Sequence, residues 1–386
     1  KPSIPFVPVA TGASGVGTGS AFGLALGALD YYGADAAPTI HLIEGEGGMT
    51  TGRVSESLAM ASASGLKNVV MHVDFNQASI DSDQVCRDGD VPGDYVQWTP
   101  EELLYLHDWN VITVEDGLDF GQVFAAQRQL GAINNEQPTA IVYRTVKGWR
   151  YGVTGKASHG AGHAFCSEGF YTALAEFENR FGVSFPRVDG GSDPVSIERT
   201  YWEFLLLVRR VLESECHIAD VMASKLSAAR TGLHGLGRAP REGAGDVSVL
   251  YDLSRIDPAR PPASLAMEPG TATTLRGTLG GVLDHLNRES NGALFIGSAD
   301  LADSTSVASG TRSFQPGYYH TGNNPEARLV SMGGISEDSM GAVMSGLSSY
   351  GRHVGVGSSY ASFIAALQHV AIRLHGIGSS AYSTRT

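Results

Sequence analysis

The sequence predicts an α/β protein with parallel sheets covered by helices, arranged in two domains. The first observation behind this prediction is an alternation along the chain, in which short apolar runs at 40–43, 69–73, 109–114 and 139–143 are separated by segments with helical spacing. Such alternation is typical of parallel sheets. The second is length, since 386 residues exceed one ordinary domain. The third is the presence of 49 glycines, which indicates many tight turns and close backbone contacts.

Composition and charge exclude several classes of protein. The hydrophobic content of 42% and the charged content of 17% are those of a globular protein. The formal net charge of −13 argues against binding to nucleic acid or to an anionic membrane surface. We find no signal-peptide pattern and no long apolar run. Cys86, Cys166 and Cys216 lack the spacing of a metal site, so we expect a reduced, cytoplasmic environment.

The chain is organised around the stretch from Leu42 to Asp81. A glycine-rich turn, Gly45-Glu46-Gly47-Gly48, follows the first apolar run, and Val54–Ala63 follows the turn as a helix. Asn76 stands just after the second apolar run. Because the carboxyl ends of parallel strands meet at one edge of a sheet, Glu46 and Asn76 should lie near each other. They offer oxygen ligands to Mg²⁺, and the bare glycine backbone lets a diphosphate approach the start of the helix.

These residues resemble the thiamine diphosphate signature of transketolases, in which Gly-Asp-Gly is followed further along the chain by Asn. The flanking Ser79-Ile80-Asp81 matches the same family. The resemblance implies a thiamine diphosphate cofactor contacted by Gly45, Gly47, Gly48, Asn76 and Ile80. It also implies Mg²⁺ (or Ca²⁺ or Mn²⁺) bound by the side chains of Glu46 and Asn76 and by the Ala78 carbonyl. Glu46 departs from the family pattern, which has Asp, and the alternative is a plain glycine turn between strands.

An earlier small-residue segment, from Ala10 to Tyr32, also matches the family. Thr11-Gly12 is followed by Gly15 and Gly17, and then by a helix with apolar residues at Phe22, Leu24, Leu26 and Leu29. In transketolases this segment lines the cofactor, and the resemblance places Gly12 and Ser14 there. The alternative is a glycine-rich helix start chosen for tight packing.

A second glycine-rich loop carries two histidines. Thr145–Trp149 resembles the equivalent segment of transketolases and of homodimeric pyruvate dehydrogenase E1 components, and the loop from Gly155 to His163 follows it. Imidazole titrates near neutral pH and is therefore a plausible proton carrier. The resemblance implies His159 as a catalytic residue, and we assign His163 to the substrate. The alternative is a surface loop with solvated histidines, and zinc is not expected because no suitable third ligand lies nearby in sequence.

The pattern changes between the two expected domains. We predict a diphosphate-binding (PP) domain over 1–185, a helical connector and linker over 186–264, and a pyrimidine-binding (Pyr) domain over 265–386. The connector contains one long helical stretch, Ile197–Leu233, followed by a linker rich in Gly, Pro and Arg up to Gly245. Compared with the family, the last domain would be incomplete.

At the start of the predicted Pyr domain, the sequence predicts a helix over Arg276–Leu286 and a strand over Ala293–Gly297. Ser-Ala-Asp-Leu, followed by another Ser, is a transketolase signature directly after that strand. The resemblance places Asp300 beside the cofactor, and Arg276 and Ser304 at a sugar phosphate, for which paired guanidinium donors are suited. A plain surface cation is the alternative for Arg276.

The last motif, Gly334-Ile335-Ser336-Glu337 with Met340, matches the family's pyrimidine-binding motif. In that family the glutamate, here Glu337, bonds N1′ of the aminopyrimidine. Sharing a proton with N1′ favours the imino tautomer, which removes the thiazolium C2 proton and makes the ylide. Tyr360 and Phe363 fall where the family has aromatic rings against the pyrimidine, with core packing as the alternative.

Together these resemblances predict a transketolase-like transferase. It would use thiamine diphosphate and Mg²⁺ to move a two-carbon ketol or acyl unit from a ketose or 2-oxo donor to an acceptor. One alternative is a 2-oxo acid decarboxylase or dehydrogenase E1-type component with a pyruvate-like substrate. Another is a cofactor-binding partner subunit that is inactive alone. Because the family builds each site from two subunits, we expect a homo- or hetero-oligomer, at least a dimer, with a second subunit supplying the remaining domains in a split enzyme. The small-molecule substrate would be a sugar phosphate or a 2-oxo acid.

Overall fold

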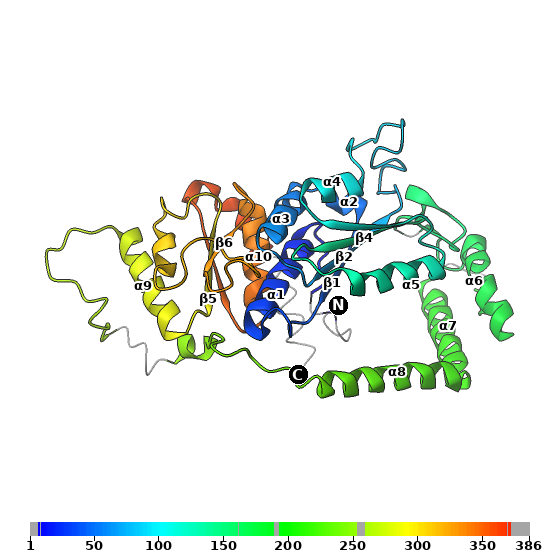
Figure 1. The fold of residues 1–386 in the computed structure, drawn as a ribbon. Helices are drawn as coiled ribbons and strands as arrows, with labels where there is room; N and C mark the ends of the chain where they lie inside the picture. Colours follow the sequence, from blue (N-terminus) through cyan, green and yellow to red (C-terminus); the bar gives the residue numbers. More distant parts are fainter. Residues whose placement is uncertain are drawn as a thin grey trace. The chain divides into compact units, whose positions relative to one another are not determined.

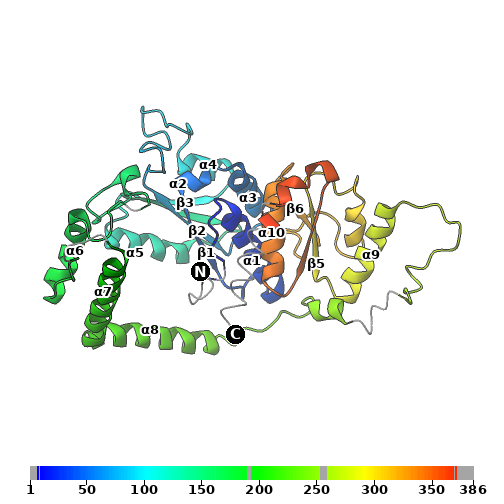
Figure 2. The same ribbon diagram turned by 180° about the vertical axis from the view of Figure 1, so that it is seen from behind.

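The computed structural model describes residues 7, 9–160, 162–188, 193–252, 259–368 and 370–371. The chain forms two compact units, shown from opposite sides in Figures 1 and 2. The first unit comprises 1–76, 84–145 and 239–386, and the second comprises 77–83 and 146–238. Both sheets found in the described part of the chain belong to the first unit, although their strands come from opposite ends of the sequence. The last residues of the predicted Pyr span, 372–386, lie outside the described residues.

The first sheet has four parallel strands in the order β1-β2-β4-β3. Their bounds are Ile40–Gly45 for β1, Val69–Phe75 for β2, Asn110–Val114 for β3 and Thr139–Arg144 for β4. All four apolar runs identified in the sequence are strands, so this part of the prediction is confirmed. The parallel register pairs Gly45 with Asp74, which brings the ends of β1 and β2 to the same edge.

The helices of this half are α1 (Val16–Tyr32), α2 (Glu46–Met49), α3 (Gly52–Ala63), α4 (Pro100–Leu106) and α5 (Phe120–Gln129), the last extended by a 3₁₀ turn, Leu130–Ala132. Thr99 caps α4, accepting from the Glu102 amide while the Glu102 side chain accepts from the Thr99 amide. The glycine-rich turn follows β1 directly. Its last residues form the single turn α2, which leads directly into α3.

The second sheet has three parallel strands in the order β6-β5-β7. Their bounds are Leu294–Ser298 for β5, Leu329–Ser331 for β6 and Val354–Ser358 for β7, and the helices are α9 (Leu275–Glu289) and α10 (Glu337–Ser349). In Figures 1 and 2, α1 and α10 lie side by side between the two sheets. The approach is close because Gly23 of α1 faces the α10 backbone and Gly346 of α10 faces the backbone of Ser20.

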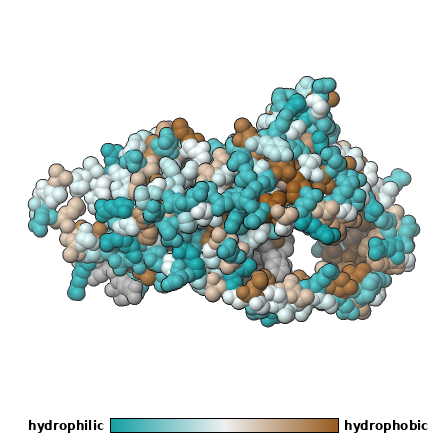
Figure 3. All heavy atoms as spheres, viewed as in Figure 1, coloured by the Kyte–Doolittle hydropathy of each residue, from teal (hydrophilic) through white to brown (hydrophobic). Residues whose placement is uncertain are grey.

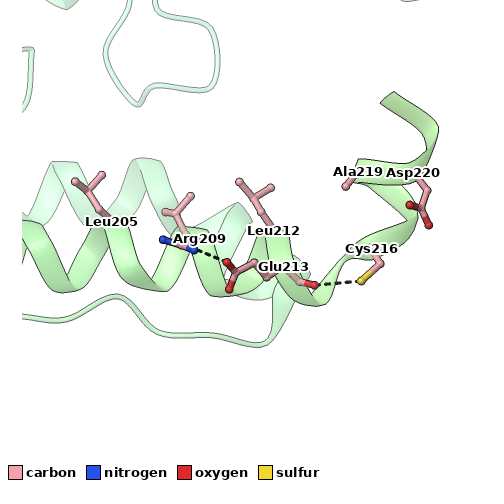
Figure 4. Close-up of a pocket in the computed structure, with 8 residues that line it drawn as sticks. Leu205, Arg209, Leu212, Glu213, Cys216, Ala219 and Asp220 are labelled. Carbon is pink, nitrogen blue, oxygen red and sulfur yellow. Dashed lines mark hydrogen bonds and ion pairs between the residues drawn. The ribbon is translucent and has the colours of Figure 1, made fainter. Parts of the chain in front are cut away.

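The second unit contains α6 (Glu168–Phe181), α7 (Pro194–Ser214) and α8 (Cys216–Gly235). The helical stretch predicted over Ile197–Leu233 is confirmed, but it is divided into two helices because the backbone leaves the helical region at Glu215 (φ −88°, ψ 52°). Figure 3 shows apolar side chains along α7 and α8, and Leu205, Leu212, Leu226 and Leu233 are among the exposed ones. An open surface hollow of about 450 Å³ lies at the elbow between the two helices, drawn in Figure 4. None of the predicted site residues lines it.

Four further 3₁₀ turns occur at Gly155–Ser158, Val247–Tyr251, Val307–Thr311 and Ala361–Phe363. A search of the described helices finds none that combines the length and apolar character needed to cross a bilayer.

Candidate functional site

Glu46 lies where the end of β1 turns into α2. It is the first residue of that turn, and its side chain is only 1% exposed. Its Oε2 accepts a hydrogen bond from the Asn76 backbone amide (3.2 Å). The two residues that the sequence analysis paired, thirty positions apart, are thus in direct contact, because β1 and β2 are parallel neighbours and end together.

Asp74, at the end of β2, also contributes to this arrangement. The Asn76 side chain donates from Nδ2 to Asp74 Oδ2 (3.0 Å), and Thr145 Oγ1 donates to the other carboxylate oxygen. The first bond engages the Asn76 amide nitrogen and so orients that side chain, and the second fixes the Asp74 carboxylate. Asp74 stands two residues before Asn76, in extended backbone at the end of β2. This spacing puts both side chains on one face and could have revealed the pair from the sequence.

The first glycine segment leads to the same region. Gly12 and Ser14 are exposed, and Gly15 adopts a left-handed conformation (φ 78°) at the start of α1. A Cβ on Gly15 would lie 2.6 Å from the side chains of Thr51 and Arg53, at the start of α3. The absence of a side chain there lets the loop pack against α3.

Three contacts join α3 to the first turn of α10. Glu56 Oε2 accepts from the Ser339 amide (3.0 Å), the Ser57 and Ser339 hydroxyls are 3.0 Å apart, and Arg53 pairs with Asp338 (3.5 Å). Burial raises the pKa of Glu56, and the nearby charges of Asp338 and Glu337 raise it further, although the Ser339 amide and Arg53 oppose the rise. The sequence analysis gave these α3 residues no role in positioning the motif of α10.

Glu337 is the first residue of α10 and is half-buried. Its Oε1 accepts a hydrogen bond from the Ser359 hydroxyl (2.9 Å), which comes from the end of β7. A carboxylate at a helix N-terminus is stabilised by the helix dipole and by the free amides of the first turn. Ser359 was not identified from the sequence.

Tyr360 and Phe363 follow directly after Ser359. Their ring centroids are 6.4 Å apart and their side chains are 42% and 50% exposed. This exposure is inconsistent with the alternative of core packing. Ile335, just before Glu337, is also exposed.

Arg276 and Ser304, both assigned to a sugar phosphate, lie together. Arg276 Nη1 donates to the Ser304 carbonyl (3.0 Å), and both residues are exposed. Asp300 is exposed at the end of β5 and has a positive φ of 59°. That conformation is uncommon for a non-glycine residue and marks a tight turn after the strand.

The second unit holds the other predicted residues. Lys147 Nζ donates to the Ser79 carbonyl (2.8 Å) and lies 3.3 Å from His159 Nδ1. His159 itself is exposed, as is Ile80, whereas Ala78 is half-buried. Lys147 lies within the Thr145–Trp149 segment, and its contact with His159 could not be predicted from spacing.

His163 occupies a different environment from His159. Its Nε2 lies 2.8 Å from the Tyr151 carbonyl, and its backbone amide donates to the Tyr151 hydroxyl (3.2 Å). The ring is half-buried against Tyr151. These contacts of His163 are therefore structural contacts with Tyr151, near the loop that carries it.

The donor set fits a hard divalent cation. Glu46 and Asn76 supply oxygen-bearing side chains at the joint end of β1 and β2, and such ligands suit Mg²⁺, Ca²⁺ or Mn²⁺. Among the described residues, no group of three or more His, Cys, Asp or Glu side chains could hold a metal. The cation ligands implied by the resemblance include one carboxylate, that of Glu46. A diphosphate and water would therefore have to complete the coordination of the cation.

The parallel sheets, the buried Glu46 after β1 and the Glu337 motif at the start of α10 define the class as α/β proteins with the transketolase-type, thiamine diphosphate binding fold. Comparisons with known proteins agree. Residues 3–169 match the family model described as transketolase, thiamine diphosphate binding domain. The resemblance predicted from the sequence is thereby confirmed.

Curated relatives match over the same part of the chain. Transketolase-like protein 2 of Homo sapiens is 33% identical over 147 residues, which is 38% of this chain and 22% of that protein. The Mus musculus protein of the same name is 31% identical over 147 residues, with the same coverage. The aligned region is thus about a fifth of the length of these relatives.

Solved structures extend the similarity to nearly the whole chain. Transketolase from Leishmania mexicana superposes with a TM-score of 0.63 at 20% identity, covering 96% of this chain and 51% of that one. Transketolase from Campylobacter jejuni gives a TM-score of 0.61 at 20% identity, covering 95% and 50%. At this identity the likeness establishes the fold, and the chain spans about half of each transketolase.

Proposed function

We propose that this chain binds thiamine diphosphate together with Mg²⁺ and acts in a transketolase-like transfer of a two-carbon unit between a ketose and an acceptor aldehyde. The observation that carries the proposal is the fixed position of Glu337. Ser359 donates to its carboxylate, and α3 holds the turn on which it stands. When bound, the cofactor supplies the electron sink for cleaving and forming a C–C bond beside a carbonyl.

The residues of the first unit have separate roles in this proposal. Glu46 and Asn76 bind the cation, and the bare backbone of Gly45, Gly47 and Gly48 admits the diphosphate. Glu337 holds a proton at N1′ of the aminopyrimidine, and Tyr360 and Phe363 present rings to it. Gly12, Ser14 and Asp300 complete the cofactor contacts by family resemblance.

Substrate contacts divide between a phosphate end and a reacting end. The exposed guanidinium of Arg276 and the hydroxyl of Ser304 are suited to a sugar phosphate. His159 is suited to moving a proton at the substrate oxygens. Ile80 and the Ala78 carbonyl belong to the cofactor and cation, and we retain His163 as a weaker substrate candidate because Tyr151 engages its ring.

Exchange of the thiazolium C2 proton for deuterium, followed by NMR, tests the proposal. We expect the assembled protein with Mg²⁺ to accelerate exchange and Glu337→Ala to abolish the acceleration. Glu289→Ala, at an exposed acid at the end of α9, is the matched control and should exchange like the unaltered protein. Full acceleration in Glu337→Ala, or none in the unaltered assembly, would reject the proposal.

A 2-oxo acid reaction is the second candidate, favoured by the position of Lys147. Its ammonium lies 3.3 Å from His159 Nδ1, so the loop presents a cation suited to a substrate carboxylate. Product analysis separates the candidates. Release of CO₂ from pyruvate supports the second, and transfer from xylulose 5-phosphate supports the first. A cofactor-binding partner subunit would show neither until its partner is added.

Assembly is part of the proposal. Ile335, Tyr360 and Phe363 expose apolar surface around Glu337, and in the resembling family a second subunit completes each site. We therefore propose a homo- or hetero-oligomer that is at least dimeric, in the cytoplasm. Light scattering on the chain alone and with co-purifying polypeptides measures its state, and a monomer that is fully active would contradict it.

A further inference from the structure

A row of hydrogen-bonded side chains crosses the first sheet. His41 on β1, His72 on β2 and Tyr143 on β4 project from the same face of the sheet, and at β4 this face packs against α5. His41 Nδ1 and His72 Nε2 are 2.9 Å apart, and His72 Nδ1 lies 2.9 Å from the Tyr143 hydroxyl. None of these residues belongs to the proposed thiamine diphosphate site.

The two imidazoles meet nitrogen to nitrogen. Their ring planes are nearly parallel (19°) and their centroids are 5.3 Å apart, little more than the nitrogen separation plus two ring radii. The facing nitrogens therefore lie close to the line between the ring centres. One shared proton is the most this pair can hold between them, so at least one lone pair points at the other ring.

We propose that His41 and His72 form a bidentate binding site for an exchangeable divalent transition metal, such as Zn²⁺ or Cu²⁺, bound between His41 Nδ1 and His72 Nε2. The proton held between these two nitrogens then moves to Nε2 of His41, so both rings stay neutral. Imidazole nitrogens suit these ions, in contrast to the oxygen ligands of Glu46 and Asn76. Two ligands on a tetrahedral ion at about 2.0–2.1 Å sit somewhat further apart than 2.9 Å, so the rings must open. His41 is exposed and its second side-chain torsion is soft, which permits this tilt.

Tyr143 would act as a second-shell positioning group. Its hydroxyl lies 2.9 Å from His72 Nδ1. When Nδ1–H donates to this hydroxyl, the lone pair of His72 is on Nε2, where the metal would bind. Metal-binding histidines commonly have such a partner on the other ring nitrogen. The rings of His72 and Tyr143 are also close to parallel (14°), so the row is held as a unit.

The face that carries this pair is open to solvent at His41. Ile43, the next residue of β1 on this face, is 82% exposed within the structure, and solvent can complete the coordination.

Titration calorimetry of the full chain with ZnCl₂, in excess MgCl₂ to occupy oxygen-ligand sites, tests the proposal. We expect one equivalent to bind, with loss of that event in His41→Ala and in His72→Ala. Tyr143→Phe should bind about 10–100-fold more weakly, the usual effect of removing a second-shell partner. His234→Ala, at an exposed histidine of α8, is the matched control and should bind like the unaltered protein.

Electron paramagnetic resonance with Cu²⁺ provides an independent readout, because two equatorial imidazole nitrogens give a resolved nitrogen splitting. We expect His41→Ala to lose this two-nitrogen pattern while its circular dichroism spectrum stays unchanged. Binding that survives both histidine substitutions, or that falls equally in His234→Ala, would identify adventitious metal only and overturn the proposal. The absence of any one-equivalent event in the unaltered protein would overturn it too. Each result is separate from thiamine diphosphate binding, so the two proposals fail independently.

Discussion

The Glu56 carboxylate accepts a hydrogen bond from the Ser339 backbone amide, at 3.0 Å, across the contact between α3 and α10. The helix α3 begins three residues after α2, which starts with Glu46, and α10 begins with Glu337. One contact between helices thus links the predicted cation ligand to the predicted catalytic acid. A shift of either helix would move both groups relative to each other.

This contact makes a prediction about pH. The pKa of Glu56 is raised in the folded protein, first by burial and then by the charges of Asp338 and Glu337. The folded state is therefore favoured most below the ordinary carboxyl pKa, and stability falls as pH rises from there through the raised value. Glu56→Gln should remove this part of the pH dependence, because the amide is neutral and its oxygen can still accept from Ser339.

Thermal unfolding of both proteins between pH 4 and pH 7 measures the effect. The difference in Tm between Glu56→Gln and the unaltered protein should move in favour of the variant as pH rises. A difference that stays constant with pH would show that Glu56 has an ordinary pKa in the folded state.

The close packing of α1 on α10 predicts that a larger residue at Gly23 destabilises the fold. A Cβ on Gly23 would overlap the Val343 carbonyl oxygen and would lie 2.5 Å from the Leu347 amide nitrogen. Backbone atoms cannot move aside as a flexible side chain can, so Gly23→Ala should destabilise by at least the 1–3 kcal/mol typical of overpacking. Chemical denaturation gives the free energy of unfolding.

Gly281 provides the matched control for that substitution. It lies within α9, and nothing is within 4 Å of the position that a Cβ would take. Gly281→Ala should stabilise by about 0.5–1 kcal/mol, since alanine has the higher helix propensity. If both substitutions have the same sign, the close contact between α1 and α10 is not as described.

Sequence reasoning predicted the features that depend on local pattern. Apolar runs of four to six residues predicted the strands of the first sheet. Glu46 and Asn76 were paired because parallel neighbours end at one edge. These predictions need only the alternation of strands and helices along the chain and the rule that such strands run parallel.

Other features depend on contacts between residues that are distant in sequence. Asp30, Arg328 and His353 meet in the core although each lies in a segment that reads as ordinary. Arg241, in what the sequence suggests is a loose linker, pairs with Asp30 across 211 positions. The break at Glu215 was missed because helical spacing continues on both sides of it. No local pattern encodes any of these.

The Asp30 cluster leads to a prediction about stability. The carboxylate is 1% exposed and contacts Arg328 (3.2 Å), Arg241 (3.1 Å) and His353 Nε2 (2.8 Å). Burial alone would raise its pKa, but the His353 hydrogen bond and the charges of Arg328 and Arg241 hold it at about 2. Asp30→Asn leaves the buried Arg328 without its counter-charge, so we expect a loss of about 3–5 kcal/mol.

Denaturation at pH 7 measures this loss, with Asp35→Asn, at an exposed acid just beyond α1, as the control that should be nearly neutral. Because the pKa is lowered in the folded state, the stabilisation is present above the ordinary carboxyl pKa and is lost as pH falls toward 2. The difference in the free energy of unfolding between Asp30→Asn and the unaltered protein should therefore become smaller below pH 4. A difference that stays constant with pH would mean that the charge of the Asp30 carboxylate does not contribute to stability.

The length of the Glu46 side chain leads to the last prediction. The family has Asp at this place, and Glu46 reaches the Asn76 amide with its extra methylene while staying buried. If Glu46 binds the cation of a diphosphate, Glu46→Gln should weaken Mg²⁺-dependent binding of thiamine diphosphate, because a hard cation loses its charged ligand. Glu46→Asp should retain binding, since it restores the usual acid.

Quenching of tryptophan fluorescence on cofactor addition, with and without Mg²⁺, measures the binding of thiamine diphosphate by both variants. Glu115→Gln, at an exposed acid after β3, should bind normally. Equal affinity of Glu46→Gln and the unaltered protein would exclude Glu46 as the metal ligand, and the cation would then depend on Asp74 or Asn76.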